Sequence, residues 1–159
     1  MTSQILTEQR KVAVEAFIGL VRAHASVTRE LSGQLLDDHG LTLSDFEALL
    51  RLSRAEGGMM RRVDLAREIL LTPSGVTRLL EGLERAGYVE KKTCESDARV
   101  TYAALTAAGR SKLKAASRTH MAQIEALFSA SYNSAELAKL GELLERFAGR
   151  ADPEECEAA

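Results

Sequence analysis

The stretch VDLAREILLTPSGVTRLLEGLERAGYV, residues 63–89, decides the fold of this 159-residue chain. A short helix is predicted over residues 60–70, and a second helix is predicted to begin after Thr72. Thr72 is a favoured N-cap residue, Pro73 suits the first helical position, and Gly87 suits a helix end. Four apolar residues of the second helix recur at helical spacing and predict one buried face: Val76, Leu79, Leu80 and Leu83. Two helices in tandem, the second of them capped, indicate a helix-turn-helix.

Directly after Gly87 the hydrophobic period changes from helical towards alternating. Residues 88–93 (YVEKKT) and 99–105 (RVTYAAL) predict two short strands joined by the polar turn of residues 94–98, CESDA. A β-hairpin in this place, immediately after the second helix, is where a winged helix carries its wing.

Further helices are predicted on both sides of this segment. One long helix is predicted over residues 7–38. Another helix is predicted to begin at the capping box of residues 42–45 (TLSD). After the hairpin, helices are predicted over most of residues 106–149. The first helix has a longer apolar stripe than a small core requires: Val14, Phe17, Ile18 and Val21, continued by Leu31 and Leu35. A second copy of the chain is the simplest candidate to cover the part of this stripe that the core leaves free.

The second helix of the tandem keeps a polar face once its core positions are removed. Candidate DNA contacts on this face are Ser74, Gly75, Thr77 and Arg78. Small residues in the first turn let the backbone approach DNA, and a helix N-terminus favours a phosphate. Arg78 can bond a guanine edge twice, and Thr77 can contact a base, a thymine methyl group or a phosphate. The alternative is that these residues are solvated surface positions without a partner.

Six residues outside this helix are further candidates for contact with DNA: Arg61, Arg62, Lys91, Lys92, Asp97 and Arg99. Arg99 beside the hairpin tip can enter the minor groove or hold a phosphate, with Asp97 orienting its guanidinium. The alternative is an ordinary surface Asp–Arg pair. Arg61 and Arg62, expected to open the short helix, can touch the backbone that flanks the groove, although adjacent arginines are more often a solvated face.

The fold class that follows is mainly α with a small β-hairpin wing. It is a winged helix-turn-helix flanked by N- and C-terminal dimerisation helices, in a single domain over residues 1–159. Residues 41–105 form the DNA-binding lobe, residues 7–38 and 106–149 the helical dimerisation lobe, and residues 150–159 an acidic tail.

The formal net charge of −2 argues against a strongly basic nucleic-acid binder, but its distribution along the chain changes this conclusion. Residues 51–99 carry 10 basic and 8 acidic groups, whereas residues 1–50 carry 4 and 7 and the last nine residues carry no basic group and 4 acidic ones. The segment with the helix-turn-helix is therefore modestly positive. This predicts weak non-specific DNA binding that depends on a few placed arginines.

The sequence supports neither an enzyme nor a metal or cofactor site. It contains no nucleophile–base motif, and its three histidines and two cysteines lack the spacing of metal ligands. No apolar run suggests a membrane segment or a signal peptide, so we expect a cytoplasmic protein with no membrane partner. Cys94 at the start of the wing turn offers an alternative, a redox-responsive regulator in which oxidation displaces Arg99.

Four features resemble the MarR family of transcriptional regulators over roughly residues 12–147. They are residues 41–52 (LTLSDFEALLRL), the helix-turn-helix of residues 63–89, the plan of long helices at both ends, and a wing signature. The wing signature is Asp-x-Arg followed after a strand by Leu-Thr-x-x-Gly: Asp97, Arg99, Leu105, Thr106 and Gly109.

The resemblance implies a homodimer on double-stranded DNA with an imperfect palindromic operator. It places Ser74, Thr77 and Arg78 on the helix in the major groove and Arg99 in the minor groove. It also implies a repressor that is released by a small-molecule effector, whose identity and binding residues the sequence leaves open. A winged-helix interaction module without DNA binding is the remaining alternative.

Overall fold

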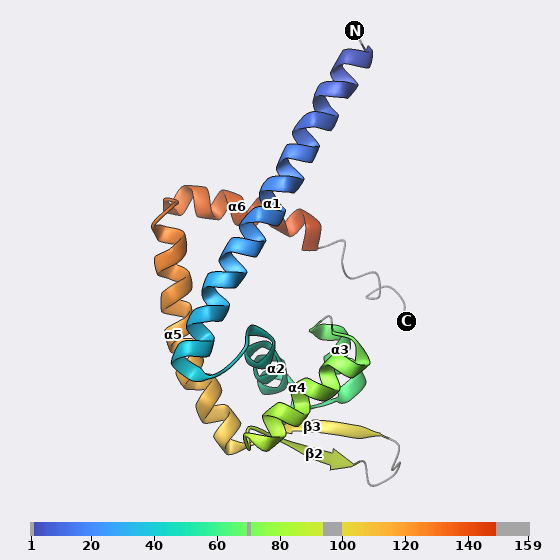
Figure 1. The fold of residues 1–159 in the computed structure, drawn as a ribbon, viewed down its shortest axis with the longest axis vertical. Coiled ribbons are helices and arrows are strands. Elements are labelled where there is room, and N and C mark those ends of the chain that lie inside the picture. The colour runs from blue at the N-terminus through green and yellow to red at the C-terminus, as the bar shows by residue number, and fades with distance from the viewer. Residues whose placement is uncertain (1, 70, 94–99, 149–159) are drawn as a thin grey trace. The chain divides into compact units, whose positions relative to one another are not determined.

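The computed structural model describes residues 2–69, 71–93 and 100–148. The chain divides into two compact units, Met1–His120 and Met121–Ala159. Figure 1 shows the elements, which in chain order are α1 (Thr2–His39), α2 (Leu43–Arg54), the 3-10 turn η1 (Glu56–Gly58), β1 (Met59–Arg61), α3 (Arg62–Glu68), α4 (Pro73–Arg85), β2 (Val89–Thr93), β3 (Thr101–Leu105), α5 (Ala107–Ser129) and α6 (Ser134–Ala148). Within the described ranges, no helix has both the length and the apolar character needed to cross a membrane.

The fold is mainly α with a small antiparallel sheet, which confirms the predicted fold class. The capping box before α2 is also confirmed, because Thr42 Oγ1 accepts from the Asp45 amide at 3.1 Å and Asp45 Oδ2 accepts from the Thr42 amide at 2.9 Å. α1 is longer than predicted and begins at Thr2 instead of residue 7. It ends where Gly40 takes a φ of 63°, a conformation that favours glycine.

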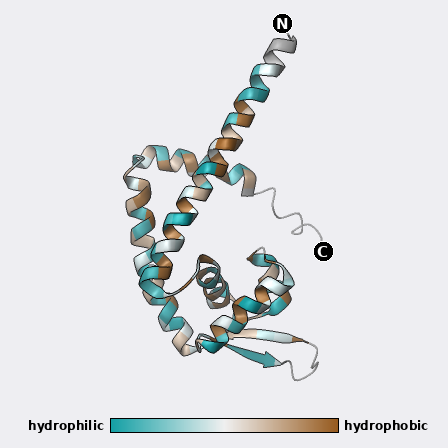
Figure 2. Ribbon diagram, viewed as in Figure 1, coloured by the Kyte–Doolittle hydropathy of each residue, from teal (hydrophilic) through white to brown (hydrophobic). Residues whose placement is uncertain are grey.

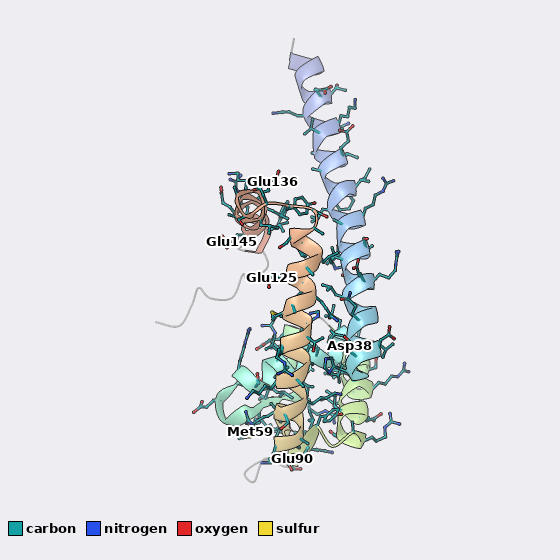
Figure 3. The ribbon with its side chains drawn as sticks, turned by 90° about the vertical axis from the view of Figure 1, so that its left-hand side faces the viewer. Asp38, Met59, Glu90, Glu125, Glu136 and Glu145 are labelled. Atoms are coloured by element: carbon teal, nitrogen blue, oxygen red, sulfur yellow. The ribbon has the colours of Figure 1, made fainter. Side chains whose placement is uncertain are left out.

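The sheet has three strands in the order β1-β3-β2, so the prediction of a two-stranded hairpin was incomplete. The missed strand is Met59–Arg61, and its last two residues fall inside the predicted short helix of residues 60–70. The chain leaves α2 through Gly57 and Gly58, both at positive φ, and β1 then pairs with the free edge of β3. Met59 and Glu90 both pair with Ala104 from opposite sides, and both lie at the sheet end of unit 1 (Figure 3).

One core holds α2, α3, α4, the sheet and parts of α1 and α5 together. Its fully buried large side chains come from four helices and the loop after α1: Leu35, Leu41, Leu49, Leu52, Leu65 and Leu80. The buried face of α4 consists of Val76, Leu80 and Leu83, with Leu79 partly buried against the same core. Burial of this face fixes which side of α4 remains open to solvent.

Thr106 joins the end of α4 to the start of α5. Its hydroxyl donates to the carbonyl oxygen of Gly87 at 2.7 Å and accepts from the Gly109 amide at 3.0 Å. The Thr106 amide donates to the Tyr88 carbonyl oxygen at 3.1 Å. A side chain at residue 109 would collide with that same carbonyl oxygen, so Gly109 is required for the close approach. The Leu-Thr-x-x-Gly part of the wing signature is therefore a structural joint.

His120 of α5 is 4% exposed, and its ring centroid lies 5.0 Å from that of Phe46 in α2. Its Nδ1 is buried and has no hydrogen-bond partner among the described residues. Burial lowers the pKa of His120 below its usual value, because the apolar surroundings disfavour the charged ring.

Replacement of Gly109 by Ala is expected to lower the free energy of unfolding by about 1–3 kcal/mol, because the new methyl group collides with the Tyr88 carbonyl. Gly82→Ala in α4 is the matched control. Nothing lies within 4 Å of a Cβ there, so this change should stabilise the protein by about 0.5–1 kcal/mol. Urea unfolding followed by circular dichroism measures the free energy of unfolding of both variants. An equal change in the two would contradict the structural role assigned to Gly109.

The protein is expected to lose stability as the pH falls through about 6.5, because the unfolded chain then binds a proton at His120 that the folded chain resists. His120→Leu removes this contribution, so the variant should gain stability relative to the wild type between pH 7.5 and pH 5.5. His24→Gln, at an exposed position of α1, is the control. Urea unfolding at both pH values measures the free energies of unfolding. If the difference between wild type and His120→Leu is the same at pH 7.5 and pH 5.5, the prediction is wrong.

Candidate nucleic-acid interface

The N-terminal end of α4 is built as the sequence predicts. Thr72 has an extended backbone and its Oγ1 accepts from the Gly75 amide at 3.1 Å, while Pro73 occupies the first turn. Ser74 Oγ lies 3.3 Å from Thr72 Oγ1. The first turn therefore presents small polar groups and a positive helix end, an arrangement that suits an anion such as a DNA phosphate.

The solvent-facing side of α4 carries Ser74, Arg78, Glu81 and Arg85, all exposed. Arg85 is turned back onto the helix, since its Nε donates to the carbonyl oxygen of Glu81 at 3.2 Å. Arg78 has neither an ion pair nor a hydrogen bond to any described residue. Its guanidinium, with five donors in a planar fork, is therefore available for a ligand outside the chain.

Gly75 and Thr77 lie at the edges of this face and are half buried. A Cβ at Gly75 would sit 3.2 Å from Thr72 Oγ1, tight against the cap, which explains the small residue there without invoking DNA. The Thr77 hydroxyl donates to the carbonyl oxygen of Pro73 at 2.9 Å. Both residues thus contribute to the helix itself as well as to its surface.

A hollow of about 560 Å³ lies between α3, the start of α4 and β3. Three arginines line it, Arg61, Arg62 and Arg67, and none of its described lining residues is a carboxylate. Thr77 forms part of its wall. The predicted residues Arg61, Arg62 and Thr77 are therefore brought together in one positively charged hollow. Arg62 Nη2 is buried and has no hydrogen-bond partner in the described part of the chain.

The prediction for Arg61 needs a correction. Arg61 ends β1 and precedes α3, instead of opening the helix, and its Nε lies 3.9 Å from Asp64 Oδ2. Sequence reasoning also missed Arg67, an exposed residue in the last turn of α3. Residue spacing offered no signal for it, because residues five apart lie about 140° from each other around a helix.

Lys91 and Lys92 are both exposed on β2, where they pair with Ala103 and Tyr102 of β3. Lys92 Nζ lies 3.0 Å from Glu90 Oε1, so part of its charge is balanced on the same strand. Neither lysine lines the arginine hollow. Asp97, Arg99 and Cys94 lie outside the described residues, and their roles rest on the sequence alone.

A family model for the MarR family matches residues 39–100, which span α2 to the wing. The HTH-type transcriptional repressor Rv2887 of Mycobacterium tuberculosis is 37% identical over 97 residues, covering 61% of this chain and 68% of the relative. The HTH-type transcriptional repressor YetL of Bacillus subtilis is 30% identical over 111 residues, covering 67% and 66%.

Solved structures give the same result. AbsC, a MarR family transcriptional regulator from Streptomyces coelicolor, is 32% identical with a TM-score of 0.70, covering 82% of this chain and 90% of its own. Sco3205 from the same organism, solved in complex with DNA, shares the fold at 23% identity with a TM-score of 0.78 and covers 89% of each chain. The chain described here belongs to the MarR family of winged-helix transcriptional regulators.

Proposed function

We propose that this chain is a sequence-specific regulator that binds double-stranded DNA with α4 in the major groove. The observation that carries the proposal is the exposed face of α4, where Ser74 and the unpaired Arg78 follow a capped, positive helix end. An α-helix fits the major groove, and a free arginine there can bond the O6 and N7 of guanine together. Sco3205, which has the same fold, was solved in complex with DNA.

The flanks of α4 supply the contacts that fix its position on the duplex. In this arrangement Arg61 and Arg62 of the hollow face the DNA backbone on one side of α4, and Lys91 and Lys92 of β2 face it from the wing. Such phosphate contacts set register and contribute affinity that depends on salt, while base contacts select the sequence. On the sequence alone, we also propose that Arg99 takes the minor-groove position that the wing signature implies, with Asp97 orienting its guanidinium.

We further infer that the active species is a homodimer. The N-terminal half of α1 leaves a stripe of large apolar side chains in solvent, alternating with polar ones along the helix (Figure 2): Val14 49%, Phe17 65%, Ile18 41% and Val21 49% exposed. In α6, Leu143, Leu144 and Phe147 are exposed as well. A contiguous exposed apolar stripe of this kind marks a protein–protein contact, and a two-fold dimer presents two copies of α4 to an imperfect palindrome, about 34 Å apart.

Repression is the regulatory outcome that we propose, since Rv2887 and YetL are both named repressors. Release of the operator by a small-molecule effector completes the proposal.

Arg78→Ala is expected to weaken operator binding by the homodimer about 30-fold or more and random-duplex binding much less, because it removes base bonds of about 1–3 kcal/mol in each half-site. Arg99→Ala should weaken both and lower the salt slope by about one unit per subunit. Arg118→Ala, exposed on α5, removes the same charge away from α4 and serves as the control. Titrations on both duplexes at several salt concentrations measure these effects. Wild-type affinity of Arg78→Ala for the operator would remove Arg78 from the interface.

Phe17→Lys is expected to raise the dimer dissociation constant about 100-fold or more. A two-fold interface counts each change twice, and a buried Phe contributes about 1.5–3 kcal/mol. Ala23→Lys places the same charge on the opposite side of α1 and should leave association unchanged. Sedimentation equilibrium gives both constants. A monomeric wild type, or equal effects of the two changes, would contradict the α1 interface.

A further inference from the structure

Thr77, on the second turn of α4, has a hydroxyl group whose hydrogen is already engaged. Its Oγ1 donates to the carbonyl oxygen of Pro73 at 2.9 Å, and a hydroxyl has a single hydrogen to donate. Thr77 is half buried at the edge of the face that carries Ser74 and Arg78. Its side chain therefore meets an approaching duplex as an acceptor and a methyl group.

This engagement narrows what Thr77 can recognise on DNA. Phosphate oxygens, guanine O6 and N7, adenine N7 and thymine O4 are all acceptors, so a bond to any of them would break the bond to Pro73. Two kinds of major-groove group remain, the amino groups of adenine and cytosine and the C5-methyl group of thymine.

The surroundings of Thr77 favour the methyl group. Thr77 shares the wall of the arginine hollow with Pro73, Val63 and Val100. Val63 is 57% exposed, on the short helix α3 whose other exposed residues are charged, and it adds an apolar side chain to the wall of the hollow. Valine and proline side chains on the same wall as Thr77 match the C5-methyl of thymine, and they offer no bond to an amino group.

We propose that Thr77 determines base specificity through its γ-methyl group, which with Pro73 and Val63 forms an apolar seat for a thymine methyl group in the major groove. Arg62 and Arg67 of the same hollow draw in the neighbouring phosphates, which hold the duplex without selecting its sequence. This inference rests on the proposed DNA-binding function and states which base chemistry α4 selects.

The test uses the full-length wild-type protein and an operator selected by it from random duplexes. Each thymine of the operator is replaced in turn by uracil, which differs only in lacking the methyl group. Two near-isosteric variants separate the parts of the side chain. Thr77→Val keeps the γ-methyl group and removes the hydroxyl, whereas Thr77→Ser keeps the hydroxyl and removes the methyl group.

We expect one thymine position in each half-site at which uracil weakens wild-type binding about four-fold, the effect of one buried methyl group. Thr77→Val should keep this preference. Thr77→Ser should lose it at that position and at no other.

The proposal is overturned if the wild type is indifferent to uracil at every thymine, or if the half-sites contain no thymine. It is also overturned if Thr77→Ser keeps the preference and Thr77→Val loses it, because the hydroxyl then makes the contact. Selection that enriches no sequence is a different result. It contradicts the proposed function itself, and this inference with it.

Discussion

The hydroxyl of Thr106 holds together the part of the structure on which the interface depends. It bonds the carbonyl of Gly87 at the end of α4 and the Gly109 amide at the start of α5. Gly109 allows the two segments to touch, because any side chain there would meet the Tyr88 carbonyl. With Thr72 capping the other end, α4 is held at both termini, so the position of the helix face that carries Ser74 and Arg78 is set by the fold.

Charge in this molecule is organised locally and not in bulk. The chain as a whole is slightly acidic, yet three arginines and no carboxylate stand among the described residues that line the hollow beside α4, and Arg78 is unpaired among the described residues. Asp64 lies close to one of these arginines, Arg61, and on β2 Glu90 balances Lys92. A binder built in this way gains little from long-range attraction and much from a few placed contacts, which favours selectivity over non-specific binding.

The features that the sequence predicts well are those that neighbouring residues determine. Thr72, Pro73 and Gly87 act within one turn of their own positions, so the limits of α4 follow from residue types alone. β1 depends instead on pairing with β3, some 40 residues later, and its last two residues look like the start of the helix that follows. Arg67 was missed for the same reason, because only the packing of α3 against α4 shows that this residue lines the hollow. The engaged hydroxyl of Thr77 also required coordinates, since residue identity alone left a base, a methyl group and a phosphate as partners.

Interference by methylation of guanine N7 tests the central claim, that α4 selects the sequence from the major groove, most directly. The modification adds a methyl group in the major groove at a site that a bound arginine occupies, and it leaves the minor groove and the phosphates unchanged. The account predicts that N7 methylation blocks binding at guanines in both half-sites of the selected operator, one helical turn apart. Full binding to an operator methylated at every guanine N7 would contradict it.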